Sequence, residues 1–368
     1  MTPKLFDAKP AMSVFAAISP YRQRSRFARA QTRHWRPAGA VALLTAGLLL
    51  GGSALAQVGS PTTQAGTTRT VNEWLSRMHE ASRQRAYTGT LVVSAGASMS
   101  ASKVWHVCDG NQQMERIDTL TGTPRTTIRR NSDVITFEPE TKTAFVEKRE
   151  SLGMFPELLR TPNNVIPQFY AARETGAQRV AGHLADMVEI LPKDDLRFGY
   201  RIWSERQTGL VVKLQTLGEQ GVVLEQMSFS ELQLDTPVSM DKLQKLMKDT
   251  RGYEVHKPLL KKTTAEAEGW RLKEAVPGFT AMSCHTRDTG ATQTPGTAPM
   301  QWVFSDGLAS VSLFVEPFDA QRHGQEKTAA VGATHSVSKR VGDHWLTVLG
   351  EVPTPTLRRF ALALERTR

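Results

Sequence analysis

The sequence predicts a mostly β protein with some α-helix, an α+β fold in two domains. Short runs of alternating apolar and polar residues follow one another between turn residues, which is typical of antiparallel sheets. A polar stretch without periodicity, Lys257–Gly269, separates two series of such runs. Capped amphipathic segments that begin near Thr70 and Thr354 predict a helix at each end of the folded part.

Residues 1–56 have the organisation of a secretory signal peptide. Tyr21–Arg36 contains six arginines and no acid, and an uncharged run follows, with its apolar centre at Val41–Leu50 and Ala54-Leu55-Ala56 at its end. This order predicts export and cleavage before Gln57. The alternative is a retained N-terminal anchor, although the apolar run is short and rich in glycine for a membrane span.

The net charge argues against a nucleic-acid partner. The whole chain carries +10, but residues 1–56 hold eight Lys and Arg and one Asp, so the exported part is close to +3. A protein that binds nucleic acid is usually much more basic, and an exported protein would not meet nucleic acid.

The exported chain has two cysteines, Cys108 and Cys284. An even number in an oxidising compartment suits a disulfide, which here would join two distant regions. Two separately buried thiols are the equal alternative.

The first domain is expected over residues 70–235, after a flexible lead at 57–69 that is rich in Gly, Ser, Thr and Pro. Thr70 and Glu73 form a capping box, and Val71, Trp74, Leu75 and Met78 then share one helical face. Strand patterns follow from Tyr87 to Leu234 and predict a curved antiparallel sheet or unclosed barrel. Ser151–Gly182 interrupts them as a helical insert, with candidate helices at Phe155–Arg160 and Val165–Arg173.

A helix and a linker are expected over residues 236–268, and a smaller C-terminal domain over 269–368. In the linking part, Met240, Leu243, Leu246 and Met247 fit a short amphipathic helix. The C-terminal domain reads as an antiparallel sheet closed by a helix, with Thr354 as its cap and Pro355 at its first position. Its apolar stripe is Leu357, Phe360, Ala361 and Leu364.

A hairpin in this second domain, Val303–Pro317, has an unusual outer face. Asp306-Gly307 predicts a two-residue type I′ turn. In the strand after it, Ala309, Val311, Leu313 and Val315 point to the core. The opposite face has no charge and carries Leu308, Ser310, Ser312 and Phe314.

The sequence contains no recognisable catalytic or metal-binding constellation. It has no G-x-S-x-G, P-loop, G-x-G-x-x-G or H-E-x-x-H motif, and its histidines are scattered singly. Ser310 and Ser312 lie mid-strand, without the base and oxyanion hole that a serine nucleophile needs. We therefore expect no enzyme, no catalytic residue, no cofactor and no metal.

A curved sheet that does not close can hold a lipid-like ligand on its apolar face. A dry, packed core is the alternative, and periodicity does not separate the two. The candidate lining residues are Leu91, Val93, Trp105, Met114, Ile117, Ile135, Phe137, Phe145, Trp203 and Met227, with Met154, Phe155 and Phe169 in the insert.

Four stretches resemble the MucB/RseB family of periplasmic regulators of an envelope-stress, extracytoplasmic sigma factor. They are QMERIDTLTGTPRTTIRRN, FGYRIWSERQTGLVVKLQTL, FSDGLASVSLFVEP and KRVGDHWLTVLGEVP, and the resemblance runs in order from about Val71 to the C-terminus.

The resemblance implies a large domain similar to the LolA and LolB lipoprotein carriers, and a periplasmic location. It also implies binding to the periplasmic part of a single-span anti-sigma factor, which shields that protein from regulated proteolysis. Lipopolysaccharide or lipoprotein acyl chains in the large-domain pocket would release the complex. The alternative is a periplasmic lipoprotein carrier or lipid-binding protein.

Under this resemblance the uncharged hairpin face becomes a candidate partner surface. The candidate partner-binding residues are Leu308, Ser310, Ser312, Phe314, Arg340 and Trp345. A homodimer through an exposed strand edge is also expected, because both domains are open sheets.

Overall fold

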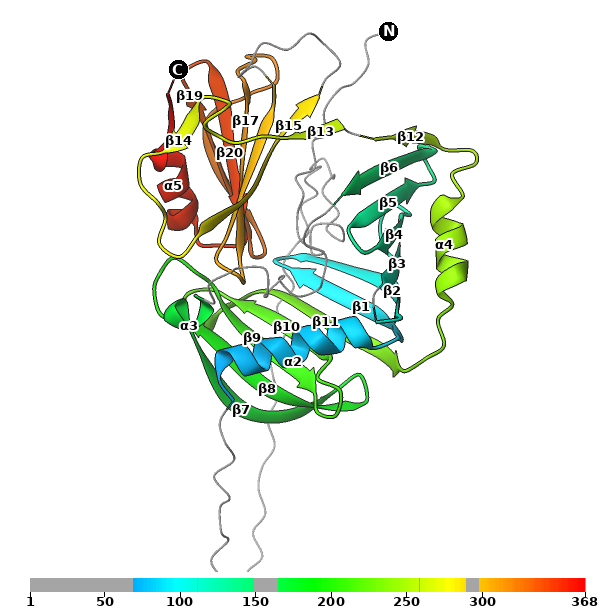
Figure 1. The fold of residues 1–368 in the computed structure, drawn as a ribbon. Helices are drawn as coiled ribbons and strands as arrows, with labels where there is room; N and C mark the ends of the chain where they lie inside the picture. Colours follow the sequence, from blue (N-terminus) through cyan, green and yellow to red (C-terminus); the bar gives the residue numbers. More distant parts are fainter. Residues whose placement is uncertain (1–68, 111, 149–164, 258, 289–297, 368) are drawn as a thin grey trace, which may run out of the picture. The chain divides into compact units, whose positions relative to one another are not determined.

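The computed structural model describes residues 69–110, 112–148, 165–257, 259–288 and 298–367. These residues form two large sheets, a small two-stranded one and few helices (Figure 1). The mostly β fold, with a large N-terminal sheet and a smaller C-terminal sheet, is as the sequence predicts. The predicted signal peptide, the flexible lead up to Thr68, the candidate helix Phe155–Arg160, Met154 and Phe155 lie outside the described residues.

The N-terminal sheet has 12 strands in the order β12-β6-β5-β4-β3-β2-β1-β11-β10-β9-β8-β7. All neighbours are antiparallel except β12, which runs parallel to β6. The strands are β1 Tyr87–Ala95, β2 Ser98–Cys108, β3 Gln113–Thr119, β4 Thr126–Arg130, β5 Asp133–Glu138, β6 Thr143–Lys148, β7 Tyr170–Val180, β8 His183–Pro192, β9 Gly199–Glu205, β10 Val211–Leu217, β11 Val223–Leu234 and β12 Glu254–His256. A 3-10 turn, Glu219–Gly221, precedes β11.

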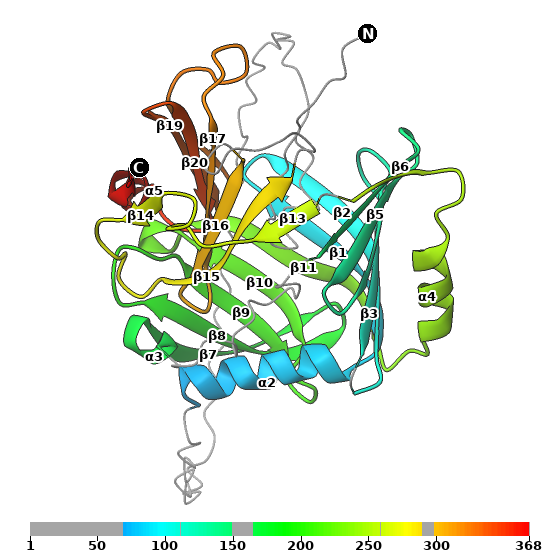
Figure 2. The ribbon, with the colours of Figure 1, turned by 45° about the horizontal axis from the view of Figure 1, so that its top comes forward.

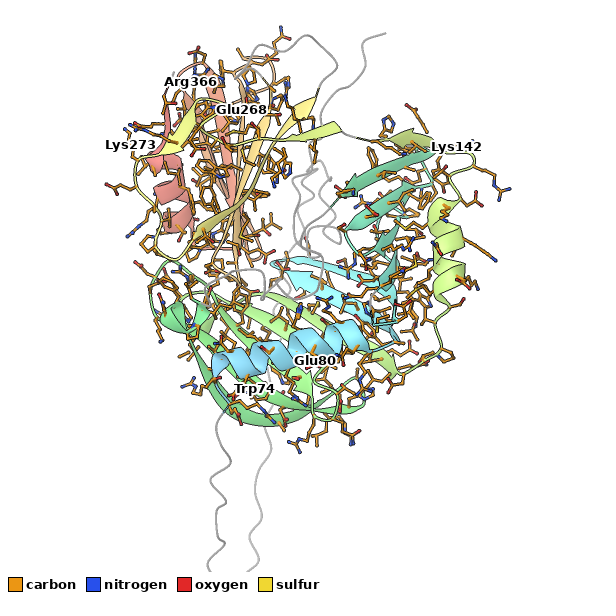
Figure 3. All side chains as sticks on the ribbon, viewed as in Figure 1. Trp74, Glu80, Lys142, Glu268, Lys273 and Arg366 are labelled. Atoms are coloured by element: carbon orange, nitrogen blue, oxygen red, sulfur yellow. The ribbon has the colours of Figure 1, made fainter. Side chains whose placement is uncertain are left out.

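Two helices cover opposite faces of this sheet. Helix α2 (Val71–Gln84) begins at the predicted capping box, and its Trp74, labelled in Figure 3, is fully buried. Helix α4 (Met240–Lys248) has Ser239 as its N-cap and packs on β3 and β4.

The strand register explains the separation of the two faces. Val104 lies opposite Ile117, and Val107 lies opposite Met114. Successive side chains of a strand point to opposite faces, so these two pairs lie on different sides of the sheet. The Val104 side packs with α2, whereas the Val107 side packs with Leu243 of α4. Figure 2 shows the two helices on different sides of the sheet.

The C-terminal sheet has seven strands in the order β13-β15-β16-β17-β20-β19-β18. They are β13 Leu259–Lys262, β15 Thr280–Asp288, β16 Met300–Ser305, β17 Ser310–Pro317, β18 Lys327–Val331, β19 Thr334–Val341 and β20 His344–Gly350. Helix α5 (Thr354–Ala363) packs on one face, where Val311, Leu313 and Val315 join its core as predicted. A separate pair, β14 (Trp270–Leu272) and β21 (Leu364–Arg366), lies beside α5.

Helix α5 and the insert differ in detail from the prediction. Pro353 is the N-cap of α5, and Leu364 starts β21 while it still packs in the core. The predicted helix Val165–Arg173 is wrong beyond its first turn: α3 is only Ile166–Phe169, and β7 begins at Tyr170. Pairing of β7 with β8 satisfies the backbone there, and the sequence pattern had not indicated β8.

The segment expected to be a linker also contains a strand. Residues 257–269 include β13, which pairs with β15, and the strand β18, which no sequence pattern had indicated, pairs with β19. The type I′ turn is wrong as well. Ser305 pairs with Ser310, so four residues form the connection, and of Asp306 and Gly307 only Gly307 has a positive φ, 98°.

Cys108 lies in β2 and Cys284 in β15, and both are free thiols. The structure therefore corrects the proposed disulfide in favour of the alternative, two separate thiols. Burial raises the pKa of the Cys284 thiol to about 12, which keeps it protonated and unreactive. Among the helices of the described ranges, none combines the length and apolarity that a membrane span requires.

Candidate functional site

On the face of the C-terminal sheet opposite α5, the central strands β15, β16, β17, β20 and β19 carry a region of small polar and apolar side chains without a carboxylate, lysine or arginine, and Lys262 of β13 and Lys327 of β18 lie at its two edges. Two cross-strand rows define it, and we call it the serine-rich face. The first row is Ser283, Val303, Ser312, Leu349 and Ser336, and the second is His285, Gln301, Phe314, Thr347 and Ser338. Most of these side chains are half-buried. A partner that covered them would not have to strip water from an ion.

One end of this face carries an aromatic and charged cluster. Trp345 pairs with Arg340 on one side and with Glu316 on the other. The His323 ring stacks on Trp345 with centroids 5.2 Å apart, and its Nε2 lies 3.1 Å from Glu316 Oε1. The Arg340 guanidinium lies 4.1 Å from the centre of the Phe318 ring. These contacts hold the rings of Trp345, His323 and Phe318 at the border of the serine-rich face.

The structure brings most of the candidate partner residues together. Ser312, Phe314, Trp345 and Arg340 share this side of the sheet, and the exposed Ser310 lies at the start of β17. Leu308 is different. Its side chain belongs to the core of the N-terminal sheet, so it is not on the serine-rich face, whereas Ser312 and Trp345 lie on that face although each is only 7% exposed.

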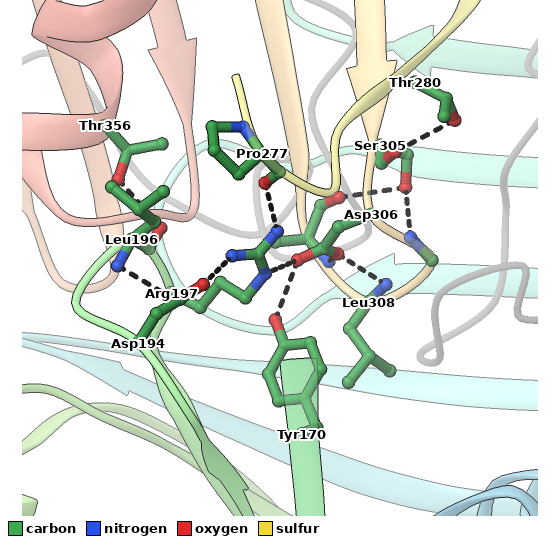
Figure 4. Close-up of polar contacts among 12 residues, drawn as sticks. Tyr170, Asp194, Leu196, Arg197, Pro277, Thr280, Ser305, Asp306, Leu308 and Thr356 are labelled. Atoms are coloured by element: carbon green, nitrogen blue, oxygen red, sulfur yellow. Dashed lines mark hydrogen bonds and ion pairs between the residues drawn. The ribbon is translucent and has the colours of Figure 1, made fainter. Parts of the chain in front are cut away.

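Asp306 holds the connection that directs Leu308 into the core of the N-terminal sheet. Its carboxylate is completely buried, and Oδ1 accepts hydrogen bonds from the backbone N–H groups of Leu308 (2.9 Å) and Ala309 (2.7 Å). Oδ2 accepts from Tyr170 Oη (3.0 Å) and Arg197 Nε (2.7 Å), both of which come from the N-terminal sheet region (Figure 4). The Asp-Gly turn is therefore a junction between the two sheets.

Arg197 is the other half of this junction, and it too is fully buried. Nη1 donates to Asp194 Oδ2 at 2.5 Å and Nη2 to the Pro277 carbonyl at 2.6 Å. The guanidinium lies 4.1 Å from the centre of the Phe169 ring and 4.9 Å from that of Phe279. Every nitrogen of the guanidinium thus has a partner, as a buried cation requires.

Each sheet also contributes a leucine to the core of the other. Leu308 packs with the α2 core, and Leu196, next to Arg197, packs with the α5 core. Thr356 of α5 donates from Oγ1 to the Leu196 carbonyl at 2.8 Å. The junction is therefore held by apolar and polar contacts in both directions.

A second contact between the sheets involves a buried carboxyl group. Glu225 of β11 accepts a hydrogen bond from the Ala333 N–H at 3.3 Å, in the turn between β18 and β19. Burial, reinforced by Glu351, raises the pKa of Glu225 to about 7. This carboxyl group changes its charge near neutral pH, at a point where the two sheets meet.

The candidate lipid-pocket residues are divided between the two faces of the N-terminal sheet. Leu91, Val93, Ile117 and Met227 pack with α2, whereas Met114, Ile135 and Phe137 pack with α4. One cavity cannot be lined by both groups, because the sheet lies between them.

The other candidates have individual contacts. Arg116 lies over the Trp105 ring, Lys213 lies over Trp203, and Phe145 stacks on His256. Phe169 packs against Arg197 in the junction.

A cavity of ≈ 670 Å³ lies on the α4 side of the sheet. Its apolar wall is Ile135, Val146, Met247 and Val255, and Arg130, Asp133, Lys248, Thr250 and Lys257 complete the lining. Of the predicted pocket residues it includes only Ile135. Sequence periodicity did not reveal this cavity, because α4 and the segment after it form half of its wall.

The described residues contain no group of three or more His, Cys, Asp or Glu side chains that could hold a metal ion. Ser312 lies between Val303 and Leu349 on the neighbouring strands, and Ser310 lies opposite Ser305. None of these neighbours is a base that could activate a serine.

The two sheets match the two halves of one protein family. The family model of the MucB/RseB N-terminal domain matches residues 70–247, and that of the MucB/RseB C-terminal domain matches residues 264–365. The curated relatives include the sigma factor AlgU regulatory protein MucB of Pseudomonas aeruginosa, 30% identical over 86% of this chain and 96% of its own length. The sigma-E factor regulatory protein RseB of Haemophilus influenzae is 25% identical over 78% of this chain and 88% of its own length.

Solved structures give the same result. A crystal structure of MucB in complex with MucA(peri) has a TM-score of 0.61 and 27% identity, over 81% of this chain and 99% of that one. The Pseudomonas aeruginosa MucA/MucB complex has a TM-score of 0.62 and 27% identity, over 80% and 98%.

The fold, with a large N-terminal sheet and a smaller C-terminal sheet, has the two-domain organisation of the regulatory proteins that these family models describe. Within this class of two-domain regulatory proteins, this chain belongs to the MucB/RseB family of sigma-factor regulatory proteins.

Proposed function

We propose that this protein is a periplasmic negative regulator of an extracytoplasmic sigma factor, and that it binds the periplasmic part of an anti-sigma factor without catalysing a reaction. The observation that carries the proposal is the match over nearly the full length to MucB, which forms a complex with MucA(peri). The serine-rich face supports it, because its two rows contain no charged side chain that a partner would have to desolvate, and their hydroxyl and amide groups can hydrogen-bond to a partner.

A binding experiment tests the proposed face. Ser312→Arg and Ser336→Arg would each place a cation on the serine-rich face. Ser230→Arg, at an exposed position of β11, is the control. We expect at least tenfold weaker binding of the periplasmic segment of the organism's anti-sigma factor by the two face variants, measured by calorimetry. Unchanged affinity in both folded variants would remove the face from the interface, and no binding by the wild type would refute the regulator.

Binding is proposed to shield the anti-sigma factor from its first regulated cleavage. A complex can protect a segment from a protease simply by covering it or by keeping it from the extended form that proteases need. The test is the cleavage rate of the anti-sigma segment by its regulatory protease with and without this protein. Equal rates at saturating protein would contradict the shielding role.

Lipopolysaccharide or lipoprotein acyl chains are proposed to bind the large domain and release the partner. The cavity beside α4 supports this, since Val146 and Met247 provide apolar surface while Lys248 and Lys257 can neutralise an anionic head group. Displacement of a fluorescent fatty acid by purified lipopolysaccharide measures the binding. Val146→Asp should abolish displacement, and an exposed Val222→Asp variant serves as the control.

Export and dimerisation complete the proposal. We infer that the signal peptide is removed before Gln57, that residues 70–235 and 269–368 are the two domains, and that the mature protein works in the periplasm. A homodimer would form through an open strand edge such as β18, whose five residues are all exposed. N-terminal sequencing of the exported protein and its mass by light scattering test these two points.

A further inference from the structure

The junction between the two sheets is built around one guanidinium. Arg197 comes from the N-terminal side, and it holds two separate segments of the C-terminal side, the Asp306 turn and the Pro277 carbonyl. The same Asp306 carboxylate holds the N–H groups of Leu308 and Ala309, directly before β17 begins. A side chain of one domain thus reaches, through one carboxylate, the strand that carries Ser312 and Phe314.

We propose that Arg197, Asp306 and Tyr170 form a latch between the domains, which fixes where the serine-rich face stands relative to the N-terminal domain. We further propose, on the basis of the proposed function, that opening this latch weakens partner binding. In this mechanism Arg197 is a positioning residue: it contacts no partner, and it acts through Asp306 on the start of β17.

The polar chemistry of this contact is better suited to an interface that can open than to a permanently closed one. A buried ion pair is often no more stabilising than apolar side chains of the same size, so we infer that this pair serves to select one arrangement of the two domains. Here the carboxylate satisfies two backbone donors, one tyrosine and one arginine at the same time. When the domains part, water can solvate all of these polar groups, whereas the exchanged leucines and the Phe169 and Phe279 rings beside Arg197 lose apolar contacts.

Gly278 gives a way to open the latch without removing a charge. Its φ is 79°, and a Cβ at this position would meet Arg197 Nη2 and come within 2.7 Å of the Phe169 ring. Gly252 is the matched control, because its φ is 80° but a Cβ there would have nothing within 4 Å. Gly278→Ala and Gly252→Ala therefore carry the same backbone strain, and only the first disturbs the latch.

The experiment measures the distance between the domains and the affinity for the partner. In a background in which Cys108 and Cys284 are replaced by alanine, spin labels are attached to the exposed positions Glu80→Cys on α2 and Ala329→Cys on β18. Double electron–electron resonance then measures the distance between the two labels. We expect one narrow distance distribution for the unsubstituted latch and for Gly252→Ala, and a broader one for Gly278→Ala. The unlabelled Gly278→Ala protein should bind the periplasmic segment of the anti-sigma factor at least tenfold more weakly than Gly252→Ala.

Each outcome bears on a separate part of the proposal. Equal distance distributions for the two alanine variants would overturn the latch. A broad distribution with unchanged affinity would overturn its role in binding, while the latch itself would stand. If the wild type does not bind the segment, the proposed function fails, and the distances still decide whether the latch exists. Should Gly278→Ala fail to fold, Arg197→Lys replaces it, since lysine keeps the charge but cannot reach all three partners.

Discussion

At the scale of single residues, Arg197 is the side chain on which most of the junction depends. Arg197→Met would leave the buried Asp306 carboxylate without its counter-ion, so we expect the free energy of unfolding to fall by about 3–5 kcal/mol. Urea unfolding followed by circular dichroism gives this value. As a control, Arg271→Met removes an exposed partner of Glu365 and should cost no more than about 1 kcal/mol.

A double-mutant cycle separates the ion pair from the packing of the arginine. Asp306→Asn keeps the shape of the turn but removes the charge, so Arg197→Met should cost less in that background than in the wild type. Equal costs in both backgrounds would show that the pair contributes through packing alone.

The buried Glu225 predicts that the free energy of unfolding depends on pH. Its pKa is raised to about 7, mainly by burial and then by Glu351, so the folded protein holds a proton that the unfolded chain releases nearer pH 4.5. The folded state then binds more protons than the unfolded state between these two values, and stability falls as the pH rises through this window.

The variant Glu225→Gln should remove this dependence. We expect its loss of stability between pH 5 and pH 8 to be smaller than that of the wild type by about 1–3 kcal/mol. Urea unfolding at both pH values measures the difference, and Glu219→Gln, on an exposed carboxylate, is the control. A slope that persists in Glu225→Gln would assign the pH dependence to another group.

At the scale of elements, α2 depends on its N-cap residue, Thr70. The Thr70 hydroxyl accepts from the Glu73 N–H at 3.3 Å, and the Glu73 carboxylate accepts from the Thr70 N–H at 2.7 Å. Thr70→Ala should therefore cost about 1 kcal/mol in the free energy of unfolding. Ser76→Ala, on the exposed side of the same helix, should change it by less than about 0.5 kcal/mol, and equal effects of the two would contradict a capping role.

The elements that the sequence could predict are those with a local signal. The capping box of α2 and the alternation in β17 depend only on neighbouring residues, and both are confirmed. β8 was missed because its charged Asp186 and Glu189 hide the strand pattern, and these carboxylates pair with arginines from other segments. β18 has five exposed residues and no apolar face, so only its pairing with β19 reveals it.

The candidate site, too, could be predicted only where the signal is local. Period two placed Ser312 and Phe314 on one face of a sheet, and the register confirms that they share it. The junction was not predictable, because Arg197 and Asp306 are 109 positions apart and each has an ordinary local explanation. Leu308 is the one residue whose position in the sequence indicates the junction. A large apolar side chain in a tight connection is usually buried, and here the core of the N-terminal sheet buries it.

At the scale of the whole molecule, the exchange of Leu196 and Leu308 predicts that the two domains unfold together. Each leucine lies in the core of the other domain, so neither core is complete when the other has unfolded. Calorimetry of the wild type should show a single transition.

Leu196→Ala combined with Leu308→Ala should separate this transition into two. Each substitution removes apolar contacts worth about 2–5 kcal/mol at the boundary, while the residues inside each core remain unchanged. Leu313→Ala is the control, because Leu313 is fully buried within the C-terminal core and should lower the stability of that domain without removing a contact between domains. Two transitions in the wild type would show that the domains unfold independently, and one undivided transition in the double variant would show that contacts other than these leucines couple them.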